Sequence, residues 1–163
     1  MKIYLASRYG RRVELCGYRE QLRELGCEVT SRWLNGNHQI DNAGKPIGDK
    51  GEALIEGDAA CATSGEDTEA AAQLRAQFAL EDIQDVYRAE TLIAFTEPPR
   101  SSASRGGRHV ELGYALAKGS KVIVVGYREN IFCWLPDVVF FETWEKALEF
   151  LKSEYNRQLN LLK

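Results

Sequence analysis

The sequence predicts one α/β domain over residues 1–163, in which a five-stranded, mainly parallel sheet is flanked by helices. Short apolar runs alternate with segments of helical periodicity, and a Gly-rich loop joins one apolar run to a helix; both patterns are typical of β–α–β units. The 163 residues suffice to bury one substantial core and are too few for two comfortable domains. The 44% hydrophobic and 28% charged content is ordinary for a soluble globular protein.

The first part of the chain predicts a β–α–β unit. Residues 2–6 are a short apolar run that forms the first strand. Between residues 15 and 25, leucines and a tyrosine recur on one face of a helix that ends at Gly26. Residues 27–33 alternate as a second strand, which a right-handed crossover makes parallel to the first.

Residues 34–67 have a different composition, rich in Gly, Asn and Asp and without a sustained period. A long irregular segment within a compact domain is often a functional lid or an insertion. Because this segment follows the carboxyl end of a strand, where α/β folds bind ligands, a lid is one expectation for it.

The remaining segments predict three more strands and three helices. A helix is expected from Thr68 to about Arg88, and Thr143 can cap a final helix. Between them, the Gly-rich segment 104–119 predicts a loop followed by a short helix. The expected strands are residues 92–95, 121–126 and 137–141, and residues 130–136 form a turn or helical segment that Pro136 closes.

Composition excludes several function classes. A net charge of −3 gives no basic surface for a nucleic acid polymer, although a nucleoside or nucleotide remains possible. Four cysteines without C-x-x-C spacing and two histidines argue against a metal site. No run reaches the roughly 18 apolar residues of a membrane span. With no secretory signal, we expect a cytoplasmic protein with reduced thiols.

The motifs leave a pair of carboxylates as the candidate chemistry. The chain has no P-loop, no G-x-G-x-x-G after the first strand and no G-x-S-x-G. Asp82 and Glu111 lie on the two helices that flank the strand 92–95, and we expect their carboxylates to converge on one pocket at the carboxyl edge of the sheet. Glu111 is expected in the first helical turn, where the helix dipole keeps it ionised. Glu81 and Asp85 are expected to face solvent.

Four segments resemble the nucleoside 2-deoxyribosyltransferases and the related deoxynucleoside 5′-monophosphate N-glycosidases. The clearest is HVELGYALAKGSKVIVV, which is similar to the signature of the family's nucleophilic glutamate. DIQDVYRAETLIAF, IYLA and NIFCW resemble the family's aspartate segment, its first strand and a segment that reaches into the neighbouring subunit. This resemblance implies a Rossmann-like (flavodoxin-like) fold. It does not cover residues 34–67 or the last helix.

The resemblance implies exchange of the base of 2′-deoxynucleosides, a pentosyl transfer of nucleotide salvage that uses no cofactor. Glu111 would form a covalent deoxyribosyl ester, Asp82 would hold the base and move its proton, and Tyr4 would orient Glu111. Its partners would be deoxynucleosides and free purine or pyrimidine bases. In a homo-oligomer, a dimer or a hexamer, Asn130 and Phe132 would complete the site of another subunit.

One position departs from the transferases. They commonly have an aspartate six residues before the nucleophile, where this chain has Arg105. With nearby serines and Arg108, Arg105 could hold a phosphate, and Gly107 would allow a ligand to approach the backbone closely. Tyr9, just after the first strand, could stack on a base.

Three functions therefore remain open from the sequence. They are a transferase, an N-glycosidase acting on a deoxynucleoside 5′-monophosphate, and a nucleotide sensor without catalysis. A phosphoribohydrolase is a more distant variant of the second, because the chain only partly matches its loop. His109 is expected to point away from Glu111, and the sequence assigns no role to His38.

Overall fold

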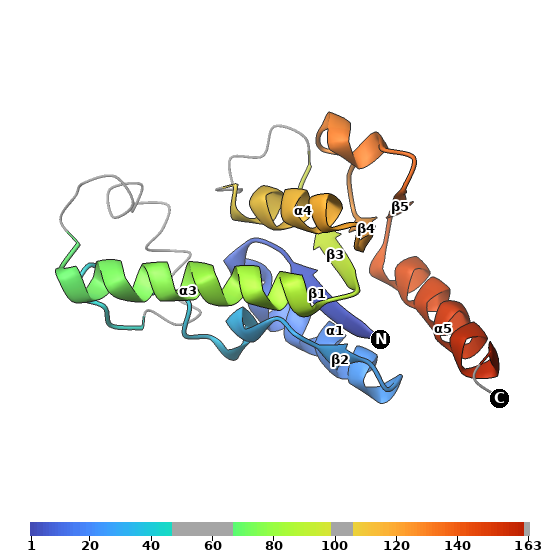
Figure 1. Cartoon of the computed structure of the whole chain (residues 1–163), viewed down its shortest axis with the longest axis horizontal. Helices are drawn as coiled ribbons and strands as arrows, with labels where there is room; N and C mark the ends of the chain where they lie inside the picture. The colour runs from blue at the N-terminus through green and yellow to red at the C-terminus, as the bar shows by residue number, and fades with distance from the viewer. Residues whose placement is uncertain (47–66, 99–105, 162–163) are drawn as a thin grey trace.

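The computed structural model describes residues 1–46, 67–98 and 106–161, and Figure 1 shows their arrangement. Its centre is one sheet of five strands in the order β2-β1-β3-β4-β5, and every neighbouring pair is parallel. This is the flavodoxin-like strand order, so the predicted fold class is confirmed. The strands are β1 (Lys2–Ala6), β2 (Glu28–Val29), β3 (Thr91–Phe95), β4 (Lys121–Val125) and β5 (Val138–Phe141).

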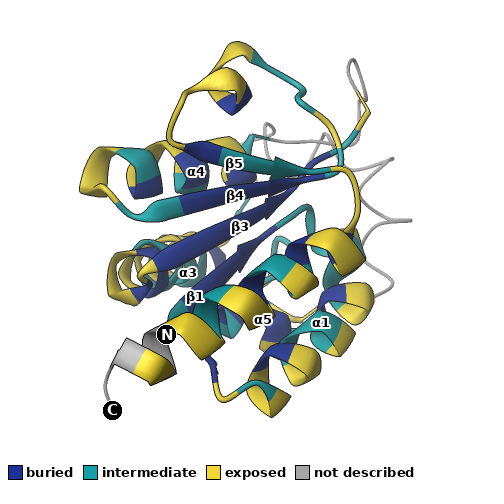
Figure 2. Ribbon diagram, turned by 90° about the vertical axis from the view of Figure 1, so that its right-hand side faces the viewer, coloured by how far each residue is buried: buried dark blue, intermediate teal, exposed yellow. Residues whose placement is uncertain are grey.

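Helices cover both faces of the sheet. Figure 2 shows α3 and α4 on one face and α1 and α5 on the other. The helices are α1 (Arg12–Glu24), α3 (Glu69–Arg88), α4 (Gly107–Lys118) and α5 (Trp144–Leu161), with 3₁₀ turns η1 (Tyr9–Arg11), η2 (Arg32–Asn35) and η4 (Ile131–Trp134). Thr68 and Thr143 cap α3 and α5 through their hydroxyl groups. In the described ranges, no helix combines the length and the apolar character that crossing a membrane requires.

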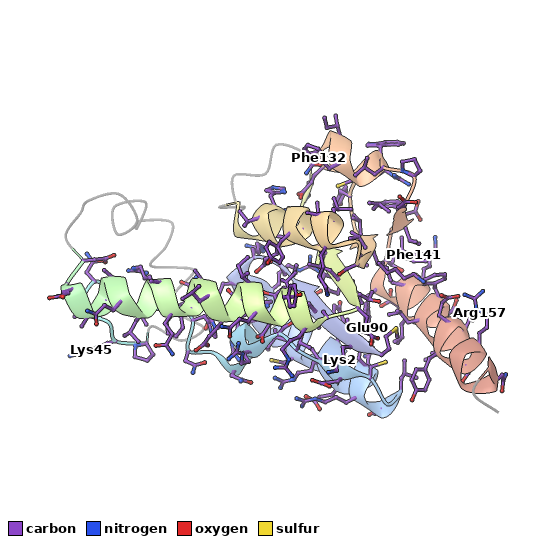
Figure 3. The ribbon with its side chains drawn as sticks, in the orientation of Figure 1. Lys2, Lys45, Glu90, Phe132, Phe141 and Arg157 are labelled. Atoms are coloured by element: carbon purple, nitrogen blue, oxygen red, sulfur yellow. The ribbon has the colours of Figure 1, made fainter. Side chains whose placement is uncertain are left out.

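The central strands form the core. All five residues of β3 are buried, and Ile3 to Ala6 of β1 are fully buried. Because helices cover both faces, these strands are continuous apolar runs without a polar face. At the amino edge of the sheet, the backbone N–H of Lys2 donates to Glu90 Oε2 at 3.1 Å, which joins the starts of β1 and β3 (Figure 3).

The second strand is much shorter than residues 27–33, so this part of the prediction was wrong. Beyond Val29, the Leu5 N–H of β1 donates to the Ser31 hydroxyl at 2.7 Å instead of to a backbone carbonyl of a neighbouring strand. Trp33 Nε1 then donates to the Leu5 carbonyl at 2.9 Å. These side-chain bonds satisfy the β1 backbone, so the chain turns into η2 instead of continuing as a strand.

Asp85 is fully buried, which contradicts the expectation that it faces solvent. The Arg32 Nε–H lies 2.9 and 3.0 Å from its two oxygens, and the Arg32 backbone N–H donates to Oδ2 at 2.9 Å. The Arg32 guanidinium also donates to the Glu81 carbonyl at 3.1 Å. A carboxylate with these donors can be buried in a helix, and here it fastens η2 to α3.

We therefore expect Asp85→Asn to destabilise the fold. The substitution leaves Arg32 without its charged partner, and breaking a buried pair typically costs about 3 kcal/mol. In a chain of this size, that corresponds to a fall in Tm of roughly 6–12 °C. Thermal unfolding followed by circular dichroism measures the effect. Asp137→Asn, the same change at an exposed position, is the control, and equal Tm values for the two variants would contradict the prediction.

Candidate active site

Tyr4 lies at the centre of the candidate site. It is a fully buried residue of β1, and its side chain lies next to Glu111 of α4 and Asp82 of α3. Its hydroxyl donates to Glu111 Oε1 of α4 at 2.7 Å. Burial, followed by the charges of Glu111 and Asp82, raises the pKa of Tyr4 well above its ordinary value of 10. The hydroxyl therefore keeps its proton and acts as a hydrogen-bond donor.

Asp82 approaches the same hydroxyl from α3. Burial, followed by the charges of Asp85 and Glu81, raises the pKa of Asp82 from 3.8 to about 7, although Arg32 and a hydrogen bond with Tyr4 lower it. Its Oδ1 is buried and has no hydrogen-bond partner among the described residues. The structure thus brings Tyr4, Asp82 and Glu111 together from three elements that are distant in the sequence.

Glu111 is the fifth residue of α4, not a residue of its first turn, which contains no acidic side chain. Burial raises the pKa of Glu111 from 4.5 to about 8, although the Tyr4 hydrogen bond and the charge of Arg108 lower it. The expectation that the helix dipole keeps Glu111 ionised at neutral pH was therefore wrong, because the dipole acts mainly within the first turn. Its Oε2 is buried and accepts no hydrogen bond from a described residue.

The two carboxyl groups can supply an acid and a base together. The pKa values of Asp82 and Glu111 are raised to about 7 and 8, and the charge of Asp82 contributes to the rise at Glu111. Near neutral pH the two groups therefore titrate as a coupled pair that can share a proton. A positive charge developing near Glu111 would favour the ionised form of Glu111 and leave the shared proton on Asp82.

Asn130 and Phe132 lie on the other side of α4 from Glu111. They line a groove of about 750 Å³ together with His109, Gly113 and Leu116 of α4. Asn130 Oδ1 caps η4 by accepting from the Phe132 N–H at 2.9 Å. Phe132 is 55% exposed, and Figure 3 labels it on this turn, above α4. Within one chain, these two predicted residues therefore do not join the cluster around Tyr4.

Arg108 is held inside the fold. Its guanidinium donates to the Phe95 carbonyl at 2.7 Å and to both oxygens of Glu129 at 2.6 and 2.7 Å. Only 3% of its side chain is exposed. Arg108 therefore fastens α4 to β3 and to the segment after β4, and it is not placed to bind a phosphate as the sequence suggested.

Of the remaining predicted residues, Tyr9 and Gly107 lie around the carboxyl edge of the sheet. Tyr9 is in η1, with its ring centroid 6.0 Å from that of Trp33. Gly107 is the first residue of α4, preceded by Gly106 with a φ of +86°. Arg105 and most of the expected lid, residues 47–66, lie outside the described residues.

His38 is a neighbour of the cluster that the sequence did not reveal. Its Nε2 lies 3.7 Å from Asp82 Oδ1 and 3.5 Å from Glu81 Oε2. A single histidine in an irregular segment has no periodicity, so no pattern could place it beside α3. In the described part of the chain, no group of three or more His, Cys, Asp or Glu residues is arranged to hold a metal ion.

Comparisons with known proteins give a likeness of fold and no match in sequence. No protein family profile matches the chain, and no curated protein sequence matches it. A solved structure, the CMP N-glycosidase BcmB of Clostridium botulinum, is similar with 18% identity and a TM-score of 0.45. The match covers 93% of this chain and 98% of that protein. A likeness at this level assigns neither family nor activity, so the family resemblance of the sequence stays a prediction.

The raised pKa of Glu111 predicts a stability change with pH. A carboxyl with a raised pKa binds more protons when folded, so the unfolding free energy falls as pH rises from about 4.5 to about 8. Glu111→Gln removes this loss and should be more stable than the wild type, increasingly so towards pH 8. Between pH 5 and 8 we expect the Tm difference to grow by roughly 7–14 °C.

Thermal unfolding at several pH values measures this difference. Glu149→Gln, the same substitution at an exposed position of α5, serves as the control and should show a small, nearly constant Tm difference. A Tm difference for Glu111→Gln that stays constant or shrinks towards pH 8 would contradict the raised pKa of Glu111.

Proposed function

We propose that the chain is a nucleoside 2′-deoxyribosyltransferase that exchanges the base of 2′-deoxynucleosides through a covalent glutamyl intermediate. One observation supports it most. Glu111 Oε1 accepts a hydrogen bond from Tyr4, while its Oε2 is buried, has no partner among the described residues, and lies beside a second carboxyl group with a raised pKa. A binding protein needs no such pair. Glycosyl transfer needs a nucleophile and an acid of this kind.

In the first step, Glu111 Oε2 attacks C1′ of the deoxynucleoside. The C1′–N bond breaks, its electron pair goes to the base, and Asp82 gives its proton to the base nitrogen. The positive charge that develops on the sugar favours ionised Glu111, so the shared proton lies on Asp82 when it is needed. Tyr4 keeps Oε1 occupied and thereby leaves Oε2 to attack.

In the second step, another base attacks C1′ of the deoxyribosyl ester. Asp82 takes the proton of the incoming base, and Glu111 leaves as a carboxylate. Two inversions at C1′ give overall retention, in ping-pong order. All these steps use side chains of this chain, so the mechanism calls for no cofactor.

The alternative is an N-glycosidase acting on a deoxynucleoside 5′-monophosphate, in which water resolves the same ester. Arg105 favours it, because this cation stands where the transferases commonly have an aspartate that contacts the sugar. A guanidinium suits a phosphate group better than a neutral 5′-hydroxyl.

An exchange assay separates these functions. We expect incubation with deoxyadenosine or thymidine and a different free base to give a new deoxynucleoside, which chromatography detects. Free base without exchange would indicate hydrolysis, and activity only on 5′-monophosphates would favour the alternative. Glu111→Ala should lower turnover by about 10³-fold or more. Full activity in this variant would exclude the mechanism.

We also propose that the site is shared between subunits of a homo-oligomer. In their own chain, Asn130 and Phe132 lie on the other side of α4 from Glu111 and cannot reach it. The large apolar side chains of η4 are exposed to solvent: 78% for Ile131, 55% for Phe132 and 68% for Trp134. Three large apolar side chains on one turn favour a protein contact. Such a contact would bring Asn130 to the site of a second copy.

Mixing two inactive variants tests the shared site. Glu111→Ala lacks the nucleophile, and Asn130→Asp keeps the oxygen that caps η4 but loses the amide. If subunits exchange at random in a dimer, one site in each mixed dimer is intact, so activity should recover to about one quarter of wild type. No recovery, despite mixed dimers shown by native mass spectrometry, would place both residues in one subunit's site.

A further inference from the structure

His38 and Asp82 place unsatisfied polar atoms against one another. The side chain of His38 is only 7% exposed, and its ring packs against Phe78 of α3 with centroids 4.6 Å apart and ring planes tilted by 34°. Both ring nitrogens lack a hydrogen-bond partner among the described residues, and so does Asp82 Oδ1. Buried polar atoms are rarely left unpaired in folded proteins, so this arrangement calls for an explanation.

The separation of these atoms is close to a hydrogen bond. His38 Nε2 lies 3.7 Å from Asp82 Oδ1 and 3.5 Å from Glu81 Oε2, and a bond needs about 2.9 Å. Glu81 already accepts a hydrogen bond from Gln77 at 2.9 Å, whereas the buried Asp82 Oδ1 has no partner among the described residues, so Asp82 has the greater need of the donor. A small rotation of either side chain covers the difference. Apo structures often have long contacts of this kind that shorten when substrate binds.

The surrounding charges decide which group donates. Burial lowers the pKa of His38 from 6.5, against the charges of Glu81 and Asp85, and Arg32 lowers it further. The ring is therefore neutral near pH 7 and has one N–H. Asp82 faces Tyr4 of β1, Glu111 of α4, Arg32 of η2, and Glu81 and Asp85 of its own helix.

We propose that His38 is a positioning residue for Asp82, whose Oδ1 accepts a hydrogen bond from the His38 Nε2–H. This inference rests on the proposed function. With Oδ1 occupied, the carboxyl proton lies on Oδ2, the oxygen left to face a base. After that proton moves to the base nitrogen, the same N–H stabilises the carboxylate that remains. His38 itself neither gains nor loses a proton.

Two substitutions separate this role from packing. His38→Phe keeps a ring against Phe78 and removes the donor, whereas His38→Gln places an amide N–H near the position of Nε2. The first should raise the pKa of Asp82, because its carboxylate loses a donor. The second should leave it close to the wild-type value.

Asp82 can be titrated directly by carbon-13 NMR of its carboxyl group in the free protein. We expect its titration midpoint to rise by about one pH unit in His38→Phe and by less than half of that in His38→Gln. Glu81→Gln supplies a control of opposite sign, since removing this neighbouring charge should lower the midpoint. Tm values would show that each variant is folded.

The rate profile gives a second readout. In His38→Phe, the descending limb of kcat/KM should move to higher pH, with kcat reduced about tenfold. His38→Gln should recover kcat to within about threefold of wild type. An unchanged Asp82 midpoint in His38→Phe, or a change that His38→Gln does not reverse, would overturn the proposal.

The two readouts also separate this inference from the proposed function. If the wild-type protein exchanges or releases no base, the proposed function fails, while the NMR titration still decides whether His38 controls Asp82. If turnover is present and depends on Glu111 but the Asp82 midpoint is unaffected by His38, only the positioning role fails.

Discussion

A tyrosine hydroxyl buried on a central strand needs an acceptor, because leaving it unpaired costs about 1–3 kcal/mol. Glu111 provides that acceptor for Tyr4, and this one bond requires α4 to lie directly over β1. Asp82 then requires α3 to lie beside it on the same face. The polar cluster therefore determines how both helices of this layer are placed, and burying two carboxyl groups there is unfavourable in the absence of substrate.

Two buried charged residues, Asp85 of α3 and Arg108 of α4, anchor these helices through ion pairs. They have opposite effects on the pKa values of the two carboxyl groups in the site. Asp85 and Arg108 each lie three residues, about one helical turn, from Asp82 and Glu111. Asp85 raises the pKa of Asp82, whereas Arg108 lowers that of Glu111. Asp85 thus favours a protonated Asp82 and Arg108 favours an ionised Glu111, which are the forms that the proposed glycosyl transfer needs. At Glu111, burial raises the pKa by more than Arg108 lowers it. The proposed mechanism therefore also needs the positive charge that develops on the substrate to ionise Glu111.

Most of the fold could be predicted from the sequence, because buried parallel strands are apolar runs that differ clearly from amphipathic helices. The prediction failed where side chains replace backbone pairing, as Ser31 and Trp33 do after β2. It also failed at Asp85, since helical spacing cannot show that Arg32, from a distant segment, covers a carboxylate. Periodicity detects faces that contact apolar surfaces and does not detect buried ion pairs.

For the candidate site, sequence reasoning could name Tyr4, Asp82 and Glu111 but could not predict their protonation. A pKa depends on desolvation, which is a property of the packed layer and not of position along a helix. The dipole argument considered only α4 itself, whereas the layer between α3, α4 and β1 removes water from Glu111. His38 shows the same limit: it becomes part of the site only because η2 carries the following segment back across α3, where Phe78 and Asp82 lie one turn apart.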